Sequence, residues 1–396
     1  MKILWVNPNF LHPTTKGGQI RTLEMVRLLH QRHEIHYAAF VRPGETEGVE
    51  RSGEYSSRAF SFPHAAPAHR STAFAIQALR SLSSPLPLSM LRYTHAGLQS
   101  FLAQAVANRT YDSIVCDFLA PAANFPRLDN AVLFQHNVES VTVRRMAEQA
   151  PDPIRRAFFN LQARRMFAYE KQACLRSGFV AAVSENDAQV MRSEFGLEKV
   201  ADIGTGVNLA YFAPQPAQPG PELVFIGSMD YLPNIDGISW FASAVLPLIW
   251  KHRPSCRLAI VGRDPSPRIQ ALANDPRIVV TGTVPDVRPY LWGGQISIVP
   301  LRVGGGTRLK IYESMAARAA MVSTTVGAEG LAVTHGETAL LADSPEAFAQ
   351  ACLGLLDEPE RCQRLAAAGR EFVASHHGWD TVTNRFEQIL ERVPAR

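Results

Sequence analysis

The sequence has 396 residues, 46% of them hydrophobic and 19% charged, with a formal net charge of +4. This length and composition predict a globular protein of about two domains and exclude a disordered or fibrous chain. The small net charge gives no indication of wholesale binding of nucleic acid. The excess of Lys and Arg over Asp and Glu lies in residues 1–215. This excess could form a surface for an anionic ligand or membrane, but a face that is simply solvated is more common.

The cysteines and the N-terminus indicate the compartment. The five cysteines are scattered, and none stands in the spacing of a metal site. This usage predicts a reducing compartment and no metal. The segment MKILWVNPNF does not have the pattern of a signal peptide. No stretch approaches the roughly 18–20 apolar residues that span a bilayer. We therefore expect a cytoplasmic protein, at most peripherally attached to a membrane.

The chain begins with a buried strand over residues 2–6, a turn that contains Gly17 and Gly18, and a helix over about 19–31. A strand, a glycine loop and a helix can bind an anion, although a lone glycine pair is more often only a turn. The next strand covers 34–41. Residues 42–89 show no regular pattern, and we expect substrate-binding loops there.

A helix over 96–108 and short strands over 113–116 and 131–134 follow. His136 comes directly after the second of these strands, at the carboxyl end where open α/β sheets place their ligands. A role in the site and a purely structural role are equally compatible with this position.

Residues 141–176 form a long helical region, broken near 150–153, in which arginines alternate with aromatic residues. Such a pattern can mark contact with nucleic acid or an anionic membrane, but the helical spacing favours buried aromatics and solvated arginines. A Pro-rich run near 211–222 is the clearest boundary in the chain. It predicts a first domain over 1–212, a linker over 213–221 and a second domain over 222–378.

The second half again alternates strands and helices. We expect strands over 223–226, 257–261, 278–281, 296–299 and 321–324, with a final amphipathic helix over about 380–393. Because no motif repeats and strands alternate with helices, the predicted fold class is α/β, with two doubly wound parallel sheets.

The segment after the strand 296–299 contains three consecutive glycines, Gly304, Gly305 and Gly306, before a helix for which Thr307 is a suitable N-cap. Such a loop lets backbone N–H groups approach an anion at the positive end of the helix dipole. Leu309, Tyr312, Ala316 and Ala319 recur at helical spacing and predict the buried face.

The first turn of this helix carries two cations, Arg308 and Lys310, where the dipole opposes each by typically about 0.3–1 kcal/mol. A bound phosphate or diphosphate would reverse that sign, and such local conflicts are typical of functional sites. Glu313 lies on the same side and suits a pair of sugar hydroxyls. The pattern predicts a site for a nucleotide sugar; the alternative is a helix whose cations simply face water.

With GGGTRLK-IYESMA after VPL, and GAEGL about a strand later, the sequence resembles glycosyltransferase family 4, retaining enzymes of the GT-B fold also called group 1 glycosyl transferases. The resemblance is strongest over 222–345. It implies two Rossmann-like domains facing each other across a cleft and closing over a nucleotide-sugar donor. It also implies no metal or cofactor, and a last helix, 379–396, that packs back on the first domain.

The resemblance also implies roles for individual residues. Glu313 would hold the ribose hydroxyls, and His136 would lie beside the transferred sugar. The remaining donor-binding residues would contact the diphosphate or the base, or lie in the loops around them: Gly17, Gly18, Gly227, Ser228, Arg263, Val284, Gly304, Gly305, Gly306 and Thr307.

Two departures from the family pattern stand out. Position 305 is glycine where the family has the first glutamate of a pair, and Ser228 and Asn234 stand where it has an arginine and a lysine. We predict that Arg308 and Lys310 supply the missing positive charge and act, with His136, as the catalytic residues.

The expected function is retaining, metal-independent transfer of a sugar, of the hexosyltransferase type, in polysaccharide biosynthesis. The partners would be a nucleotide-sugar donor and a saccharide or lipid-linked acceptor, with no nucleic acid and at most a peripheral contact with the inner membrane surface. A sugar-nucleotide epimerase of similar fold and a non-catalytic nucleotide-sugar-binding protein are the alternatives.

Overall fold

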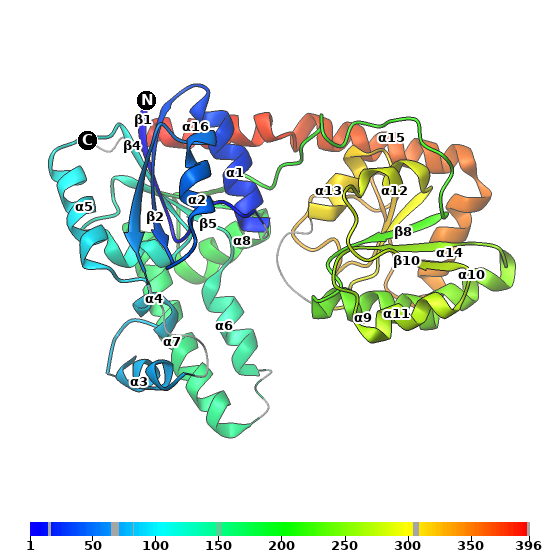
Figure 1. The fold of residues 1–396 in the computed structure, drawn as a ribbon, viewed down its shortest axis with the longest axis horizontal. Coiled ribbons are helices and arrows are strands. Elements are labelled where there is room, and N and C mark those ends of the chain that lie inside the picture. Colours follow the sequence, from blue (N-terminus) through cyan, green and yellow to red (C-terminus); the bar gives the residue numbers. More distant parts are fainter. Residues whose placement is uncertain are drawn as a thin grey trace. The chain divides into compact units, whose positions relative to one another are not determined.

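The computed structural model describes residues 1–14, 17–64, 71–81, 83–148, 150, 152–303 and 309–393. The chain divides into two compact units, one of Met1–Gly204 with Val382–Arg396 and one of Thr205–Thr381 (Figure 1). The sequence places the end of the first domain at residue 212, with a linker over 213–221. The contacts divide the chain earlier, so residues 205–221 belong to the second unit.

The first unit is built on a seven-stranded parallel sheet in the order β3-β2-β1-β4-β5-β6-β7. Strands β1, β2, β4 and β5 are buried almost throughout, as expected for a parallel sheet with helices on both faces. The strands are β1 Lys2–Asn7, β2 Glu34–Val41, β3 Arg58–Pro63, β4 Ser113–Asp117, β5 Ala131–Gln135, β6 Phe179–Ala182 and β7 Val200–Asp202.

The helices of the first unit follow the predicted pattern in most places. The long helical region breaks where the sequence predicts, into two helices that lie side by side and extend beyond the sheet (Figure 1). The helices are α1 Gly17–His30, α2 Glu47–Glu50, α3 Thr72–Ser81, α4 Leu88–Leu91, α5 Ala96–Ala107, α6 Glu139–Glu148, α7 Pro153–Arg176 and α8 Glu185–Val190.

Strand β3 is an element that the sequence does not predict. It lies inside the stretch 42–89 and pairs in parallel with β2, from His36 opposite Arg58 to Val41 opposite Pro63. All of its residues are exposed or half-buried, so it lacks the apolar run of a central strand. As an edge strand it also tolerates a proline at its end.

The second unit is a six-stranded parallel sheet in the order β10-β9-β8-β11-β12-β13. Its strands are β8 Leu223–Ile226, β9 Leu258–Val261, β10 Ile278–Val280, β11 Ile296–Val299, β12 Ala320–Ser323 and β13 Leu340–Leu341. Its helices are α9 Leu232–Trp240, α10 Leu246–His252, α11 Pro267–Gln270, α12 Arg288–Gly293, α13 Leu309–Ala316, α14 Pro345–Asp357 and α15 Pro359–His376. The prediction of two doubly wound parallel sheets is confirmed.

Helices α9 and α10 are joined by a π-helical turn into one run, Leu232–His252. In the part of the chain that the structure describes, this run alone is long and apolar enough to cross a membrane. More than half of it is buried inside the second unit, as in the core helix of a globular domain.

The last helix, α16 Trp379–Arg392, belongs to the first unit from Val382 onward. Phe386 is fully buried, with its ring 5.4 Å from that of Trp5 and 5.1 Å from that of Phe134. Glu387 accepts from Arg32 at 2.7 Å. Helix α16 therefore packs on β1 and β5 of the first sheet.

The strand order reverses once in each sheet, between β1 and β4 in the first and between β8 and β11 in the second. Ligands of open α/β sheets bind at the carboxyl ends of the strands at such a point. We therefore expect a ligand site among the residues that directly follow these four strands.

Candidate active site

Asp117, the last residue of β4, is the centre of a buried hydrogen-bonded cluster in the first unit. Its Oδ2 accepts from Trp5 Nε1 at 2.8 Å, Asn7 Nδ2 at 2.6 Å and Thr22 Oγ1 at 2.8 Å. Its Oδ1 lies 2.7 Å from His136 Nε2. The carboxylate is fully buried, and four donors offset the cost of removing its charge from water.

His136 is bonded through both of its ring nitrogens. Nε2 faces Asp117, and Nδ1 lies 3.2 Å from Arg21 Nη1. Since Arg21 can only donate, Nδ1 accepts and Nε2 carries the proton that it donates to Asp117. Burial lowers the pKa of His136, with Asp117 opposing the shift, and burial also lowers the pKa of Arg21 to about 10. The ring is thus neutral and oriented near pH 7.

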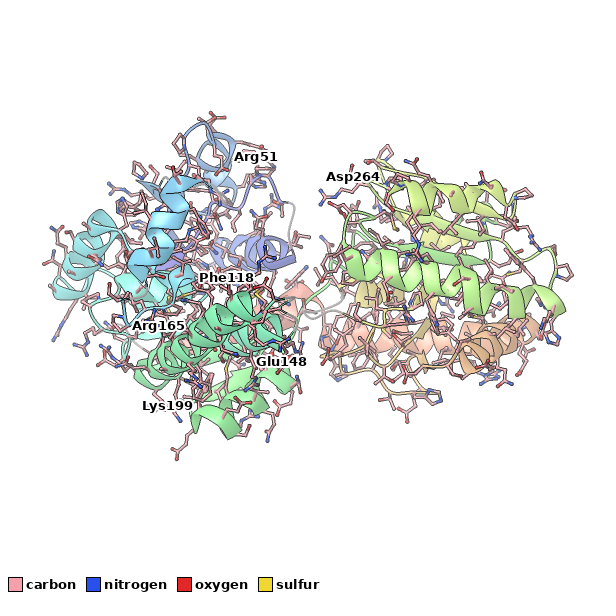
Figure 2. The ribbon with its side chains drawn as sticks, turned by 90° about the horizontal axis from the view of Figure 1, so that it is seen from below. Arg51, Phe118, Glu148, Arg165, Lys199 and Asp264 are labelled. Carbon is pink, nitrogen blue, oxygen red and sulfur yellow. The ribbon has the colours of Figure 1, made fainter. Side chains whose placement is uncertain are left out.

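Phe118 covers one face of His136, with ring centroids 3.8 Å apart and planes only 8° from parallel. Phe118 has φ 67°, a left-handed conformation that is strained for an aromatic residue. Gly18, in the first turn of α1, lies against this ring: a Cβ there would be 2.8 Å from Phe118 Cζ. A side chain at position 18 would therefore displace Phe118. Figure 2 labels Phe118 among the side chains of the first unit.

These contacts bear on the role expected for His136. The residue is only 6% exposed, and both nitrogens already have protein partners. In this arrangement Asp117 and Arg21 hold the orientation of the His136 ring through its two nitrogens. Contact between His136 and a transferred sugar stays a prediction.

A cavity of about 630 Å³ opens beside this cluster, with Gly18, Phe118 and Glu139 in its lining. Its size is that of a typical small-molecule site. Burial raises the pKa of Glu139, the first residue of α6.

Glu170 of α7 holds the start of α6. Its Oε1 accepts from the backbone N–H of Glu139 and its Oε2 from that of Ser140, both at 2.8 Å. It therefore serves as the N-terminal cap that the helix needs. Burial raises the pKa of Glu170 to about 7, although these hydrogen bonds favour the charged form.

Glu170→Gln is expected to lower the free energy of unfolding by about 1–3 kcal/mol, because the amide group would place a donor against one of the two N–H groups. The pKa of Glu170 is about 7 in the folded protein, above its value in the unfolded chain. Its contribution to the free energy of unfolding is therefore complete below about pH 4.5 and is lost as the pH rises through 7. Urea unfolding at pH 5, 6, 7 and 8 should therefore show a flatter pH dependence in the variant. If the free energy of unfolding depends on pH equally in the variant and the unaltered protein, Glu170 is not the source of this dependence.

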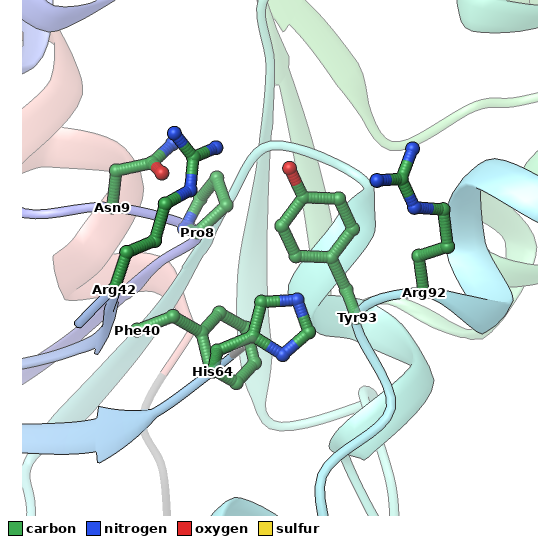
Figure 3. Close-up of a pocket in the computed structure, with 7 residues that line it drawn as sticks. All are labelled: Pro8, Asn9, Phe40, Arg42, His64, Arg92 and Tyr93. Atoms are coloured by element: carbon green, nitrogen blue, oxygen red, sulfur yellow. The ribbon is translucent and has the colours of Figure 1, made fainter. Parts of the chain in front are cut away.

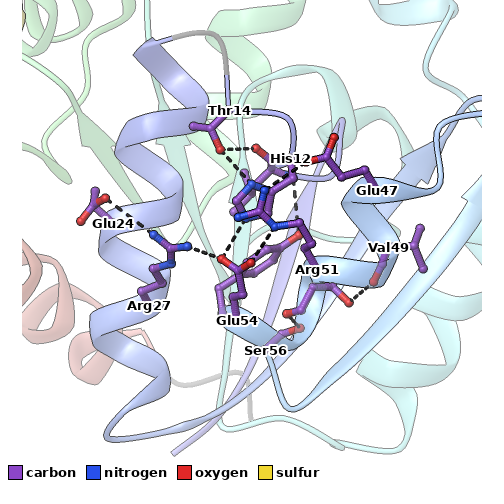
Figure 4. A network of polar contacts seen from close by, with 12 residues as sticks. His12, Thr14, Glu24, Arg27, Glu47, Val49, Arg51, Glu54 and Ser56 are labelled. Atoms are coloured by element: carbon purple, nitrogen blue, oxygen red, sulfur yellow. Dashed lines mark hydrogen bonds and ion pairs between the residues drawn. The ribbon is translucent and has the colours of Figure 1, made fainter. Parts of the chain in front are cut away.

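A network of charged side chains surrounds His12, in the segment after β1 (Figure 4). Glu54 accepts from Arg51 Nε at 2.7 Å and from Arg27 of α1, and its Oε2 lies 3.2 Å from His12 Nε2. Arg51 also donates to Glu47 at 3.0 Å. The hydrogen bond from Arg51 contributes most to lowering the pKa of Glu54 to about 2, so this carboxylate is charged at physiological pH.

A second cluster lies in the second unit, where β8 and β9 end. Asn234 Nδ2 donates to the Ser228 carbonyl at 2.8 Å, and Arg263 Nε donates to Ser228 Oγ at 2.8 Å. The loop after β8 and the loop after β9 are in contact, because a Cβ on Gly262 would lie 1.7 Å from the Gly227 carbonyl oxygen. Only glycine allows this approach, which brings Gly227, Ser228 and Arg263 together.

Lys310, in the first turn of α13, reaches into this same cluster. Its Nζ donates to Asn234 Oδ1 at 2.9 Å and lies 4.6 Å from the centre of the Phe225 ring. A Cβ on Gly227 would be 2.7 Å from Nζ, so glycine there leaves room for the ammonium group. The cation of α13 thus lies at the loop after β8, beside the strand-order reversal between β8 and β11.

Glu313 lies one turn further along α13 and is half-buried. Burial raises its pKa to about 7, and Lys310 opposes the shift. The side chain of Val284 packs on a small apolar group formed by Val224, Ala259 and Val261, and a contact of its backbone with a base stays a prediction. The buried face of α13 is Ile311, Tyr312, Met315 and Ala316, and Leu309 is only half-buried.

The remaining predicted site residues lie outside the described residues, namely Gly304, Gly305, Gly306, Thr307 and Arg308. Gly17 is the first residue of α1. Among the described residues no group of three or more His, Cys, Asp or Glu could hold a metal ion.

Asp117, Arg21 and Phe118 are members of the first unit's cluster that the sequence does not predict. A signal for Asp117 is present, because it ends the apolar run SIVCD at the carboxyl end of β4, next to the strand that precedes His136. Arg21 gives no such signal, since an arginine on an amphipathic helix normally faces water.

Comparison with known proteins adds independent information. Residues 220–358 match the family model for Glycosyl transferases group 1. Over 136 residues, 32% of this chain and 35% of the relative, the sequence is 26% identical to an uncharacterized 44.6 kDa protein in the cps region of Klebsiella pneumoniae. The alignments span between 35% and 49% of the length of the first curated relatives.

Two solved structures match along the whole chain. Anabaena Alr3699/HepE in complex with UDP has a TM-score of 0.68 and 13% identity, covering 98% of this chain and 99% of that one. Sucrose-phosphate synthase from Thermosynechococcus elongatus has a TM-score of 0.67 and 19% identity, covering 98% of each chain. These likenesses show a GT-B fold.

Proposed function

We propose that this chain, whose residues 220–358 form a group 1 glycosyl transferase domain within a GT-B fold, transfers a sugar from a nucleotide-diphosphate sugar to a hydroxyl group of a saccharide or lipid-linked acceptor. The reaction would retain the anomeric configuration and use no metal or cofactor, as the resemblance to glycosyltransferase family 4 implies. The relative in a cps region supports a place in polysaccharide biosynthesis. The compartment would be the cytoplasm, with at most a peripheral contact with the membrane.

The observation that carries the proposal is the position of Lys310. Its ammonium group lies at the carboxyl end of β8, beside Gly227 and Asn234, in the matched domain. The family has a lysine at the position of Asn234. Here the amide of Asn234 accepts a hydrogen bond from a lysine of another helix, so the missing positive charge is restored at nearly the same place.

A cation there would perform the electrostatic part of the reaction. As the bond between the anomeric carbon and the diphosphate breaks, negative charge accumulates on the leaving diphosphate. Lys310, with Arg308, would stabilise that charge in a partly buried site, where such interactions are strong. The HepE complexes with UDP and with UDP-glucose support a nucleotide sugar as the donor class.

A thermal-shift panel of nucleoside diphosphates and their sugars tests the donor class directly. A ligand at 100 times its dissociation constant should stabilise the protein by about 2.7 kcal/mol. Release of nucleoside diphosphate, measured with and without candidate acceptors, then separates a transferase from an epimerase, which converts its substrate without an acceptor, and from a non-catalytic binding protein. Binding without any turnover would contradict the proposal.

The affinity for the nucleotide sugar is expected to rise with pH around neutrality. Glu313 can accept hydrogen bonds from two ribose hydroxyls only as a carboxylate, and its pKa is about 7. The dissociation constant should therefore fall by up to about tenfold between pH 6 and pH 8. Calorimetric titration with an intact nucleotide sugar avoids the titration of a terminal phosphate. Glu313→Gln should bind more weakly at pH 8 and show no such dependence; a variant that retains the full dependence would exclude Glu313 as its source.

A further inference from the structure

A basic pocket lies in the first unit, where three neighbouring strands end. Its volume is about 130 Å³ (Figure 3). Asn9 follows β1, Arg42 follows β2 and His64 follows β3, while Arg92 and Tyr93 follow α4. Because β1, β2 and β3 are neighbours in the sheet, their carboxyl ends bring these polar groups together.

The pocket carries two arginines from different elements. The side chain of Arg42 is 56% exposed and forms an ion pair with Glu45 through one contact of 3.5 Å. An ion pair at such exposure contributes little to stability. The guanidinium group of Arg92 lies 5.5 Å from the centre of the Phe74 ring. Figure 3 shows the two guanidinium groups on either side of Tyr93, whose hydroxyl points in the same direction.

His64 forms the floor of the pocket. It stacks on Tyr93, with centroids 5.6 Å apart and planes 19° from parallel, and it packs against Phe40 at 4.9 Å. Its Nε2 is buried and has no hydrogen-bond partner among the described residues. A buried polar atom without a partner is costly, and a ligand atom within reach would remove that cost.

The basic pocket adjoins the larger cavity beside Gly18 and Phe118. Asn9, Phe40, Arg42 and Tyr93 line both. A ligand that fills the cavity of about 630 Å³ can therefore lie against Gly18 and Phe118 and still reach the two arginines.

On the basis of the transfer proposed above, we propose that the basic pocket is an acceptor subsite that holds a phosphoryl group, so that the acceptor is a phosphorylated or diphosphate-linked saccharide. Arg42 and Arg92 bind its oxygens, and Tyr93, Asn9 and His64 add neutral donors around them. The reacting hydroxyl of the acceptor lies toward Gly18 and Phe118.

The number and direction of the donors favour a phosphoryl group over a carboxylate. A guanidinium group pairs with two oxygens of either anion in a fork. A single carboxylate has two oxygens and is satisfied by one such fork. Two arginines on either side of Tyr93, with the Asn9 amide and the His64 imidazole in the same pocket, suit an anion that has three or more oxygens.

The experiment is calorimetric titration of the full chain with inorganic pyrophosphate in the presence of saturating UDP, or of whichever nucleoside diphosphate the thermal panel identifies, so that the donor site is filled. Arg42→Gln and Arg92→Gln should each weaken pyrophosphate binding by about 10- to 100-fold and leave nucleotide binding unchanged. Arg127→Gln, an exposed arginine paired with Asp129 in the same unit, is the matched control and should bind as the unaltered protein does.

Additional measurements distinguish a lipid-linked from a soluble acceptor and separate loss of binding from loss of folding. Geranyl diphosphate binding more tightly than pyrophosphate would assign a lipid-linked acceptor, and equal binding would assign a soluble phosphorylated saccharide. Arg92→Lys keeps the charge and should recover part of the affinity if Arg92→Gln lowers the melting temperature. Absence of pyrophosphate binding, binding unaltered in both arginine variants, or tighter binding of glucuronate would overturn the proposal. Each of these results is independent of nucleotide binding, which tests the proposed transfer itself.

Discussion

Replacing Lys310 by alanine is expected to lower kcat by about 10²–10³-fold, the usual effect of removing one group that stabilises developing negative charge. The ammonium group lies 2.9 Å from Asn234 Oδ1 and fills the space that the missing side chain of Gly227 leaves. Its charge matters most when the diphosphate departs, so kcat should fall more than donor affinity. Steady-state rates of nucleoside diphosphate release, with donor binding measured by calorimetry, separate the two quantities.

The chain offers a matched rescue for this variant. If positive charge at the end of β8 is what matters, Lys310→Ala combined with Asn234→Lys should recover at least about tenfold in kcat, because Asn234 lies beside the position that the ammonium group vacates. Lys310→Met, which keeps most of the packing against Phe225, should be as inactive as the alanine variant. Near-normal turnover in Lys310→Met would exclude a catalytic role for the charge.

The position of this lysine shows what the sequence can and cannot predict. Two cations at the positive end of a helix are visible as a local conflict, and the departure at Asn234 is visible beside the family pattern. Their contact is not visible, because strands β9, β10 and β11 and several helices separate Asn234 from Lys310 in the sequence. Only the parallel pairing of β8 with β11 brings them together.

In the first unit, too, some elements are predictable from the sequence and others are not. The buried strands are predictable from apolar runs bounded by turns, since both faces of the sheet are covered. Strand β3 and the carboxylate of Asp117 escape prediction for opposite reasons: β3 is an exposed edge with no apolar run, and Asp117 is a charged residue where burial is unusual. The basic pocket depends on β3, because it places His64 beside Arg42.

Replacing Asp117 by asparagine is expected to lower kcat by about 10²-fold, through loss of the orientation of His136 and Arg21. If the amide nitrogen of the variant faces His136, Nε2 must accept and Nδ1 must carry the proton. Nδ1–H would then oppose the Arg21 donor 3.2 Å away. Arg21 would also lose the buried negative charge that favours its protonated form, so the free energy of unfolding should fall by about 3–5 kcal/mol.

Loss of stability alone must be distinguished from loss of orientation. Activity is measured well below the melting temperature of the variant, and the tautomer of His136 is read from its ¹⁵N chemical shifts. The unaltered protein should show a neutral ring protonated at Nε2, and Asp117→Asn should shift the proton to Nδ1. Asp129→Asn, at an exposed position that pairs with Arg127, is the control and should change neither quantity. An unchanged tautomer with normal kcat would mean that Asp117 serves the fold alone, because a positioning role requires both to move together.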